Sequence, residues 1–252
     1  MRGITWAVVV VVFACAFGAG CAGVPRGEAV PVALIYEAEV PGLPQARFPH
    51  DVSDEILTGY LVEMSQKRRA SFGLGPKDPL PDATFLAMSG GGSDGAYGAG
   101  VLCAWTERGD RPEFVVVTGV STGALIAPFA FLGPEYDSVL RETYTKTTDE
   151  DILKPRGVLR GVMSDAMADT APLAKMIARE FGEREMEAVA REWRRGRWLL
   201  IATTNIDSGR PVIWDIGAIA ASGHPGALEL IRKVLLASAA IPGAFPPVMF
   251  DV

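Results

Sequence analysis

Short apolar runs alternate along most of this chain with segments whose apolar residues recur every three or four positions. The runs are typical of buried strands, and the three- and four-residue spacing is typical of helices. The runs predict strands over residues 84–88, 114–118, 198–204 and 211–214. The spacing predicts helices over residues 95–107, 135–145, 172–181, 186–193 and 226–238. Strands separated by helices indicate an α/β fold with a mainly parallel sheet covered on both faces.

The same patterns divide the chain into an N-terminal part and a compact domain. Residues 24–49 are rich in Pro, Gly and Ala, which is typical of a tether. Ser53 can cap a helix that runs to about Gln66, and we expect the apolar face of that helix to pack on the main domain. A stretch rich in Gly and Pro then forms a boundary. We therefore predict a tether and accessory helix within residues 21–81, and the compact domain over residues 82–252.

The first twenty residues have the pattern of an export signal. Arg2 precedes an apolar stretch that ends in small residues before Cys21, and no other charged residue occurs before Arg26. This pattern predicts a signal peptide over residues 1–20. Its end resembles the lipobox of bacterial lipoproteins, which implies a lipidated Cys21 and an exported, membrane-anchored protein. Ala22 is similar to the residue that follows the cysteine in lipoproteins sent to an outer membrane. An uncleaved membrane anchor is the alternative.

Composition limits the classes of partner. A chain of 252 residues that is 49% hydrophobic can bury one sizeable core. The net charge is −6 and the basic residues are scattered, which argues against a nucleic-acid partner. Cys15 belongs to the predicted signal and Cys21 would carry lipid, so Cys103 has no cysteine to pair with and is expected in the core.

A serine between two glycines carries the first candidate chemistry. Gly119, Ser121 and Gly123 form a Gly-x-Ser-x-Gly motif directly after the predicted strand over residues 114–118 and before an apolar helix. A strand–turn–helix in this order is the context of a nucleophile elbow, in which a tight turn exposes the serine hydroxyl. Glycine is required two positions before and after the serine because a Cβ would not fit. We therefore expect Ser121 to be a nucleophile.

A second glycine-rich turn lies upstream, after the first predicted strand of the domain. Gly90, Gly91 and Gly92 leave backbone N–H groups free at a helix N-terminus, where an anion is favoured. Such a turn can serve as an oxyanion hole in acyl transfer. The segment also matches the Gly-x-Gly-x-x-Gly pattern of dinucleotide sites. That interpretation requires an acidic residue at the end of the next strand, and Ser121 and its neighbours stand there instead.

These two motifs, together with residues 237–247, resemble the patatin-like phospholipase family over about residues 83–252. The resemblance implies a three-layer α/β/α fold. It also implies hydrolysis of acyl esters, commonly in lipids, by a Ser-Asp dyad with no metal or organic cofactor. Ser121 matches the family's nucleophile, and Gly90, Gly91 and Gly92 match its oxyanion loop. The expected partners are a lipid or other acyl ester as substrate, and a membrane that holds the lipidated N-terminus.

Two positions depart from the family's pattern. Asp94 stands where the family often has Arg or Lys, and we expect its carboxylate to point away from an oxyanion. The family's aspartate lies in an Asp-Gly-Gly or Asp-Gly-Ala motif shortly after the Pro-Pro segment. Asp251 is followed by Val252 and does not match. We therefore expect the catalytic aspartate beyond Val252.

Other bases and another class of function remain open. A Ser-His-Asp esterase would need His224, which lies in a predicted turn, because His50 lies in the tether. Asp207 and Asp215 are further carboxylates near predicted strands. A protein that keeps the fold but only binds lipid or a partner is the alternative to an enzyme.

Overall fold

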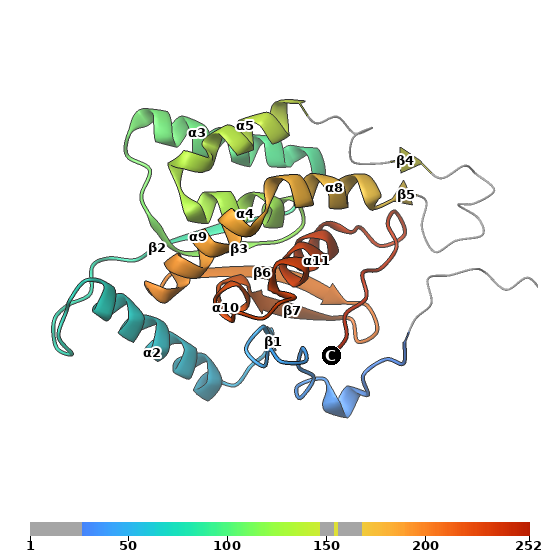
Figure 1. Ribbon diagram of the computed structural model, residues 1–252, viewed down its shortest axis with the longest axis horizontal. Helices are drawn as coiled ribbons and strands as arrows, with labels where there is room; N and C mark the ends of the chain where they lie inside the picture. The colour runs from blue at the N-terminus through green and yellow to red at the C-terminus, as the bar shows by residue number, and fades with distance from the viewer. Residues whose placement is uncertain (1–26, 147–153, 156–167) are drawn as a thin grey trace, which may run out of the picture.

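The computed structural model describes residues 27–146, 154–155 and 168–252 (Figure 1). The predicted signal peptide over residues 1–20 and the predicted lipidation site Cys21 lie outside the described residues. A five-stranded sheet in the order β1-β7-β6-β3-β2 forms the centre. Strands β2, β3 and β6 are parallel, β7 runs antiparallel to β6, and β1 pairs antiparallel with β7. The predicted α/β fold with a mainly parallel sheet is confirmed.

The elements agree closely with the predicted ranges. The strands of the main sheet are β1 (Arg47–Pro49), β2 (Thr84–Met88), β3 (Phe114–Gly119), β6 (Trp198–Asn205) and β7 (Arg210–Asp215). A separate two-stranded sheet pairs β4 (Lys154–Pro155) with β5 (Ala168–Asp169). The α-helices are α2 (Asp54–Ser71), α3 (Gly95–Arg108), α4 (Thr122–Leu132), α5 (Asp137–Lys146), α8 (Ala171–Glu180), α9 (Glu183–Arg194), α10 (Ile216–Ala221) and α11 (Ala227–Ala239). Short 3-10 helices are η1 (Val32–Leu34), η2 (Gly92–Asp94) and η3 (Pro134–Tyr136).

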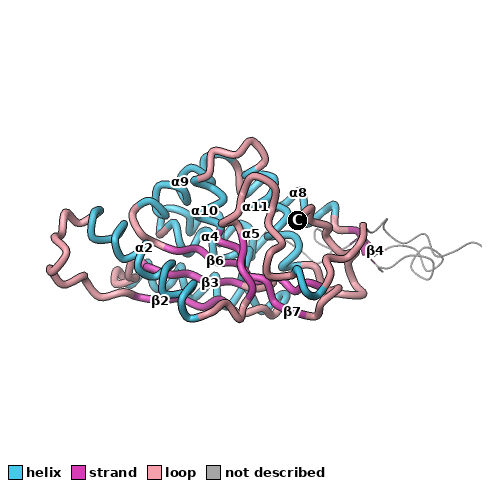
Figure 2. The backbone as a smooth tube through the Cα atoms, turned by 90° about the horizontal axis from the view of Figure 1, so that it is seen from below, coloured by secondary structure: helices cyan, strands magenta, loops and turns pink. Residues whose placement is uncertain are grey.

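Different helices cover the two faces of the sheet. On one face, Val117 is fully buried, and a Cβ on Gly119 would contact Ala127 of α4. On the opposite face, Trp198 packs against Tyr60 of α2, with 5.8 Å between the ring centroids. Figure 2 shows α9, α10 and α11 on one side of the strands. The result is the three-layer arrangement that the family resemblance implies.

The N-terminal part is more closely joined to the domain than a tether would be. We expected residues 24–49 to form a tether, but Arg47–Pro49 is strand β1 at the edge of the sheet. Leu43 and Ala46 just before it are buried in the core. Helix α2 begins after Ser53, whose hydroxyl accepts a hydrogen bond from the Ile56 N–H, and runs to Ser71 rather than Gln66. None of the helices in the described ranges is both long enough and apolar enough to span a bilayer.

Candidate active site

Ser121 lies in a sharp turn between β3 and α4. Its backbone has φ 55° and ψ −127°, and among the described residues it is the one non-glycine residue with positive φ. This conformation is costly for a residue with a Cβ, and such strain is concentrated at functional sites. Ser121 occupies the N-cap position of α4, but its hydroxyl makes no capping hydrogen bond. The hydroxyl therefore does not cap the helix, which is the usual role of a serine at this position.

The glycines on either side of Ser121 allow this turn to form. A Cβ on Gly119 would lie 2.6 Å from the Gly123 carbonyl oxygen and 2.9 Å from the Ala124 Cα. A Cβ on Gly123 would collide with the carbonyl oxygens of Met88 and Ser89. Both obstacles are mainly backbone atoms, which cannot move aside without shifting β3 or the loop after β2. The turn thus requires glycine at both positions.

The glycine-rich loop after β2 lies directly beside the serine. A Cβ on Gly90 would lie 2.9 Å from the Ser121 Cβ and 3.5 Å from the Ser121 Oγ. The loop is joined to the elbow by a hydrogen bond from the Val120 N–H to the Met88 carbonyl, at 3.2 Å. Two elements that lie thirty residues apart in sequence are therefore adjacent at the carboxyl ends of β2 and β3.

The other two predicted oxyanion residues lie further along this loop. Gly91 lies against Asp94, with its ideal Cβ position 3.2 Å from the Asp94 Cβ, and a Cβ on Gly92 would meet nothing within 4 Å. Gly92 has φ 57°, which favours glycine. Asp94 is exposed to solvent and lines the hollow beside the glycine loop, so the direction of its charge relative to the serine stays a prediction. Of the three, Gly90 is the residue in direct contact with Ser121.

Thr122 supplies a backbone amide next to the nucleophile candidate. It is the first residue of α4, where N–H groups have no carbonyl partner within the helix. Its side chain is buried and turned toward α5, with 2.9 Å between the Thr122 Oγ1 and the Tyr144 Oη. Burial raises the pKa of the Tyr144 phenol, which keeps this pair neutral. The Thr122 hydroxyl is therefore paired on the α5 side, and only the backbone amide of Thr122 remains as a candidate donor at the site.

Ser238 is a site residue that sequence reasoning missed. Its hydroxyl accepts a hydrogen bond from the Ser121 N–H at 2.9 Å and lies 2.7 Å from the Ala202 carbonyl oxygen, to which it donates. It lies in the last turn of α11, within the 237–247 segment that contributes to the family resemblance. Because Ser121 and Ser238 lie 117 positions apart in the sequence, no local pattern predicts their hydrogen bond.

The structure removes Asp215 from the candidates for a base. Its carboxylate caps α10 through the Ala218 N–H at 2.8 Å and accepts the Trp198 Nε1–H at 2.6 Å. Asp215 pairs with Leu200 near the start of β6. Leu200 in turn pairs with Thr118 of β3, so Asp215 lies two strands away from β3, and both of its carboxylate oxygens are already engaged by N–H donors. Burial raises the pKa of Asp215 to about 6, although hydrogen bonds from the backbone and the two indoles oppose this.

His224 also lies far from the elbow, so the geometry does not support a triad. It precedes α11, and the eleven residue steps from Ala227 to Ser238 span about 16 Å of helix. Because Ser238 contacts Ser121, His224 at the other end of α11 is out of hydrogen-bonding range. Its Nδ1 instead accepts the Gly226 N–H at 3.0 Å, which is a turn-forming contact.

Asp207 has a turn-forming role as well. Its N–H donates to the Asn205 Oδ1 at 3.0 Å, and its side chain is exposed. Strand β6 runs four residues, about 13 Å, past Ile201, the partner of Gly119, before it reaches this turn. Within the described ranges, no side chain forms a hydrogen bond with the Ser121 Oγ.

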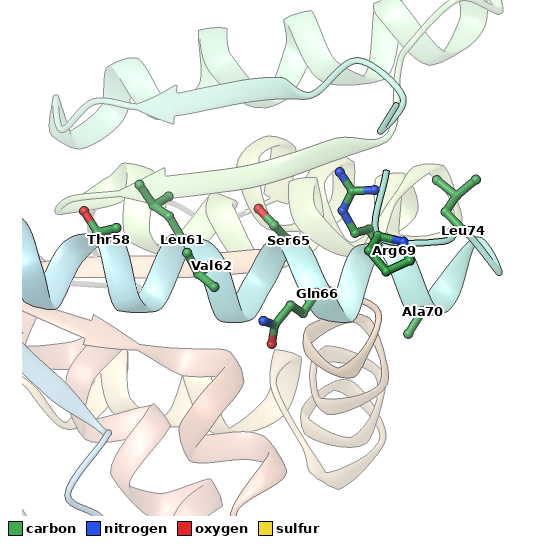
Figure 3. Close-up of a pocket in the computed structure, with 9 residues that line it drawn as sticks. Thr58, Leu61, Val62, Ser65, Gln66, Arg69, Ala70 and Leu74 are labelled. Atoms are coloured by element: carbon green, nitrogen blue, oxygen red, sulfur yellow. The ribbon is translucent and has the colours of Figure 1, made fainter. Parts of the chain in front are cut away.

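Two surface hollows lie in the described part of the molecule, one of them beside the glycine loop. One of about 350 Å³ adjoins the glycine loop and is lined by Gly90 and by mainly apolar residues of β2 and α3. The larger, of about 590 Å³, lies along α2 (Figure 3). Its labelled residues, such as Leu61 and Ser65, belong to α2 or the loop that follows, and they do not include the elbow or the glycine loop. The described ranges contain no group of three or more His, Cys, Asp or Glu that could hold a metal ion.

An α/β fold with a serine elbow beside a glycine-rich loop defines a class of acyl-transferring hydrolases. A family model described as Patatin-like phospholipase matches residues 86–252, which is more than half of the chain. The chain therefore belongs to the patatin-like phospholipase family, a family of lipid acyl hydrolases. A comparison with curated proteins found no match.

Proposed function

We propose that the protein is a serine-dependent lipid acyl hydrolase in which Ser121 is the nucleophile. The observation that carries the proposal is the strained Ser121 backbone, held with its hydroxyl beside Gly90 at the start of α4. The amides of the Gly90–Gly92 loop and of Thr122 are the proposed oxyanion donors. The positive end of the α4 dipole adds to their effect on a developing negative charge.

The proposed reaction proceeds through an acyl-enzyme. The Ser121 Oγ attacks the carbonyl carbon of an acyl ester while its proton passes to an aspartate, the base of the family's dyad. The bond to the leaving alcohol then breaks, and the alcohol takes the proton. Water then attacks the acyl-enzyme and gives a proton to the same carboxylate. That proton passes to the Ser121 Oγ as the bond to the acyl group breaks, which releases the acid and restores the serine hydroxyl. In both steps the loop amides stabilise the oxyanion.

The proposed substrate is a lipid or a related acyl ester, and the proposed location is a membrane surface. The signal-like N-terminus and Cys21 support export and lipidation. One alkyl chain gives marginal attachment, whereas several give stable anchoring. A protein with a lipidated Cys21 would therefore stay beside its substrate.

Fluorophosphonate labelling followed by intact mass tests the proposal. These reagents react with activated serines, so we expect one adduct on the wild-type protein and none on Ser121→Ala. Ser222→Ala is the matched control, since Ser222 ends α10 and has ordinary turn hydrogen bonds. A folded wild-type protein that takes up no label, yet binds lipid vesicles, would favour the non-catalytic binding module instead.

A further inference from the structure

Ser238 connects three elements at the candidate site with two hydrogen bonds. Its Oγ receives the Ser121 N–H from the elbow and donates to the Ala202 carbonyl of β6. Ser238 itself belongs to α11, which packs on both β6 and α4. A serine in a helix ordinarily bonds a carbonyl one turn back in its own helix, and Ser238 bonds a neighbouring strand instead.

The two bonds fix the direction in which the Ser238 hydroxyl points. A hydroxyl has one hydrogen to donate and two lone pairs that accept. Because its hydrogen is committed to the Ala202 carbonyl, the Ser238 Oγ can only accept at the elbow. Its lone pair is therefore held toward the Ser121 N–H at 2.9 Å.

The bond also fixes which amides are free to bind an oxyanion. The Ser121 N–H is already occupied by Ser238, whereas the Thr122 N–H lies in the first turn of α4 without a helical partner. Loss of the Ser238 hydroxyl would release the Ser121 amide and would remove a restraint on a backbone that is strained at φ 55°.

We propose that Ser238 is a positioning residue for the nucleophile, which holds the Ser121 backbone so that the Thr122 and glycine-loop amides, and not the Ser121 amide, form the oxyanion hole. This inference rests on the proposed function of Ser121. Ser238 touches no reacting atom, so its effect is on the rate of the chemical step rather than on substrate binding.

Labelling kinetics separate this role from a general structural one. In Ser238→Ala we expect the maximal rate of fluorophosphonate labelling to fall about tenfold, as the loss of one hydrogen bond would give. The reagent concentration at half-maximal rate should stay the same. Ser238→Thr keeps a hydroxyl and should restore most of the rate.

Ser222→Ala is the matched control, because Ser222 Oγ also accepts an N–H, from His224, and lies 2.7 Å from a carbonyl, that of Ile219. Equal slowing in Ser222→Ala, or no rescue in Ser238→Thr, would overturn the assignment.

Hydrogen exchange at the Ser121 amide gives a readout that does not depend on activity. We expect this amide to be protected in the wild-type protein and to exchange at least tenfold faster in Ser238→Ala. The Ala124 N–H, which bonds the Ser121 carbonyl at 2.9 Å, should keep its protection if the fold is intact. Unchanged exchange at Ser121 would refute the role of Ser238, whereas absence of labelling with the expected exchange would refute the proposed function alone.

Discussion

The indole of Trp198, at the start of β6, donates a hydrogen bond of 2.6 Å to the carboxylate of Asp215, at the end of β7. Trp193 donates to the same oxygen at 3.3 Å, and the other oxygen caps α10. This buried carboxylate therefore joins α9, β6 and α10. Its strong burial and its three hydrogen bonds from N–H donors indicate a structural role.

We predict that Asp215 makes the protein less stable as pH rises from about 4 to 7. Burial raises the pKa of Asp215 from 3.8 to about 6, so the native state binds a proton more tightly than the unfolded chain across this interval. The unfolding free energy should then fall with rising pH, by about 3 kcal/mol from this group. Denaturant unfolding of the wild-type protein and of Asp215→Asn over this pH range provides the measurement. The difference between their unfolding free energies should shrink by that amount. Asp207→Asn, at an exposed turn, should show no such trend, and a difference for Asp215→Asn that is constant with pH would contradict the prediction.

The secondary structure could be predicted where a segment is long enough for its apolar residues to show the pattern of a strand or of a helix. The runs at β2, β3 and β6 and the spacing in α8 and α9 gave boundaries close to those observed. Helix α10 has six residues, too few to show helical periodicity, and we did not predict it. Strand β1 has three residues, ends in Pro49 and follows a Pro- and Gly-rich stretch, so its pairing with β7 has no local signal.

The candidate site divides in the same way between local and non-local features. The elbow is one continuous turn that contains Gly119, Ser121 and Gly123. The five consecutive residues 119–123 are enough to predict its chemistry. The contact between Gly90 and Ser121 follows once two parallel strands are neighbours. The bond from the Ser121 N–H to Ser238 depends on how α11 packs, which no spacing along the chain could predict.

Gly123→Ala should be strongly destabilising, whereas Gly100→Ala should not. An added methyl group at Gly123 would collide with the carbonyl oxygens of Met88 and Ser89, so the loop after β2 must move away from α4. At Gly100, within α3, a Cβ would meet nothing within 4 Å, and alanine should stabilise the helix by about 1 kcal/mol. Thermal unfolding of both variants provides the measurement. A Gly123→Ala protein as stable as wild type would show that the elbow is not as tightly packed as described.

Cys21→Ala should abolish lipid attachment if the N-terminus is processed as proposed. The thiol is the proposed acceptor of the diacyl group, and Cys15 lies within the segment that would be removed. Expression with a radiolabelled fatty acid should therefore label the wild-type protein and Cys15→Ala, but not Cys21→Ala. A mature wild-type protein that still begins at Met1 would argue for an uncleaved anchor.

Gly90→Ala should slow the chemistry at Ser121 without unfolding the protein. The new methyl group would lie 2.9 Å from the Ser121 Cβ and 3.5 Å from its Oγ, so the loop must retreat from the nucleophile. Gly90 is exposed, which allows such a shift at little cost to the core. If the loop amides bind the oxyanion, their retreat should lower the maximal rate of fluorophosphonate labelling by about a hundredfold, as the loss of an oxyanion donor does elsewhere. Gly100→Ala serves as the control and should label at the wild-type rate. A Gly90→Ala protein that is folded and reacts as fast as wild type would exclude this loop from the oxyanion hole.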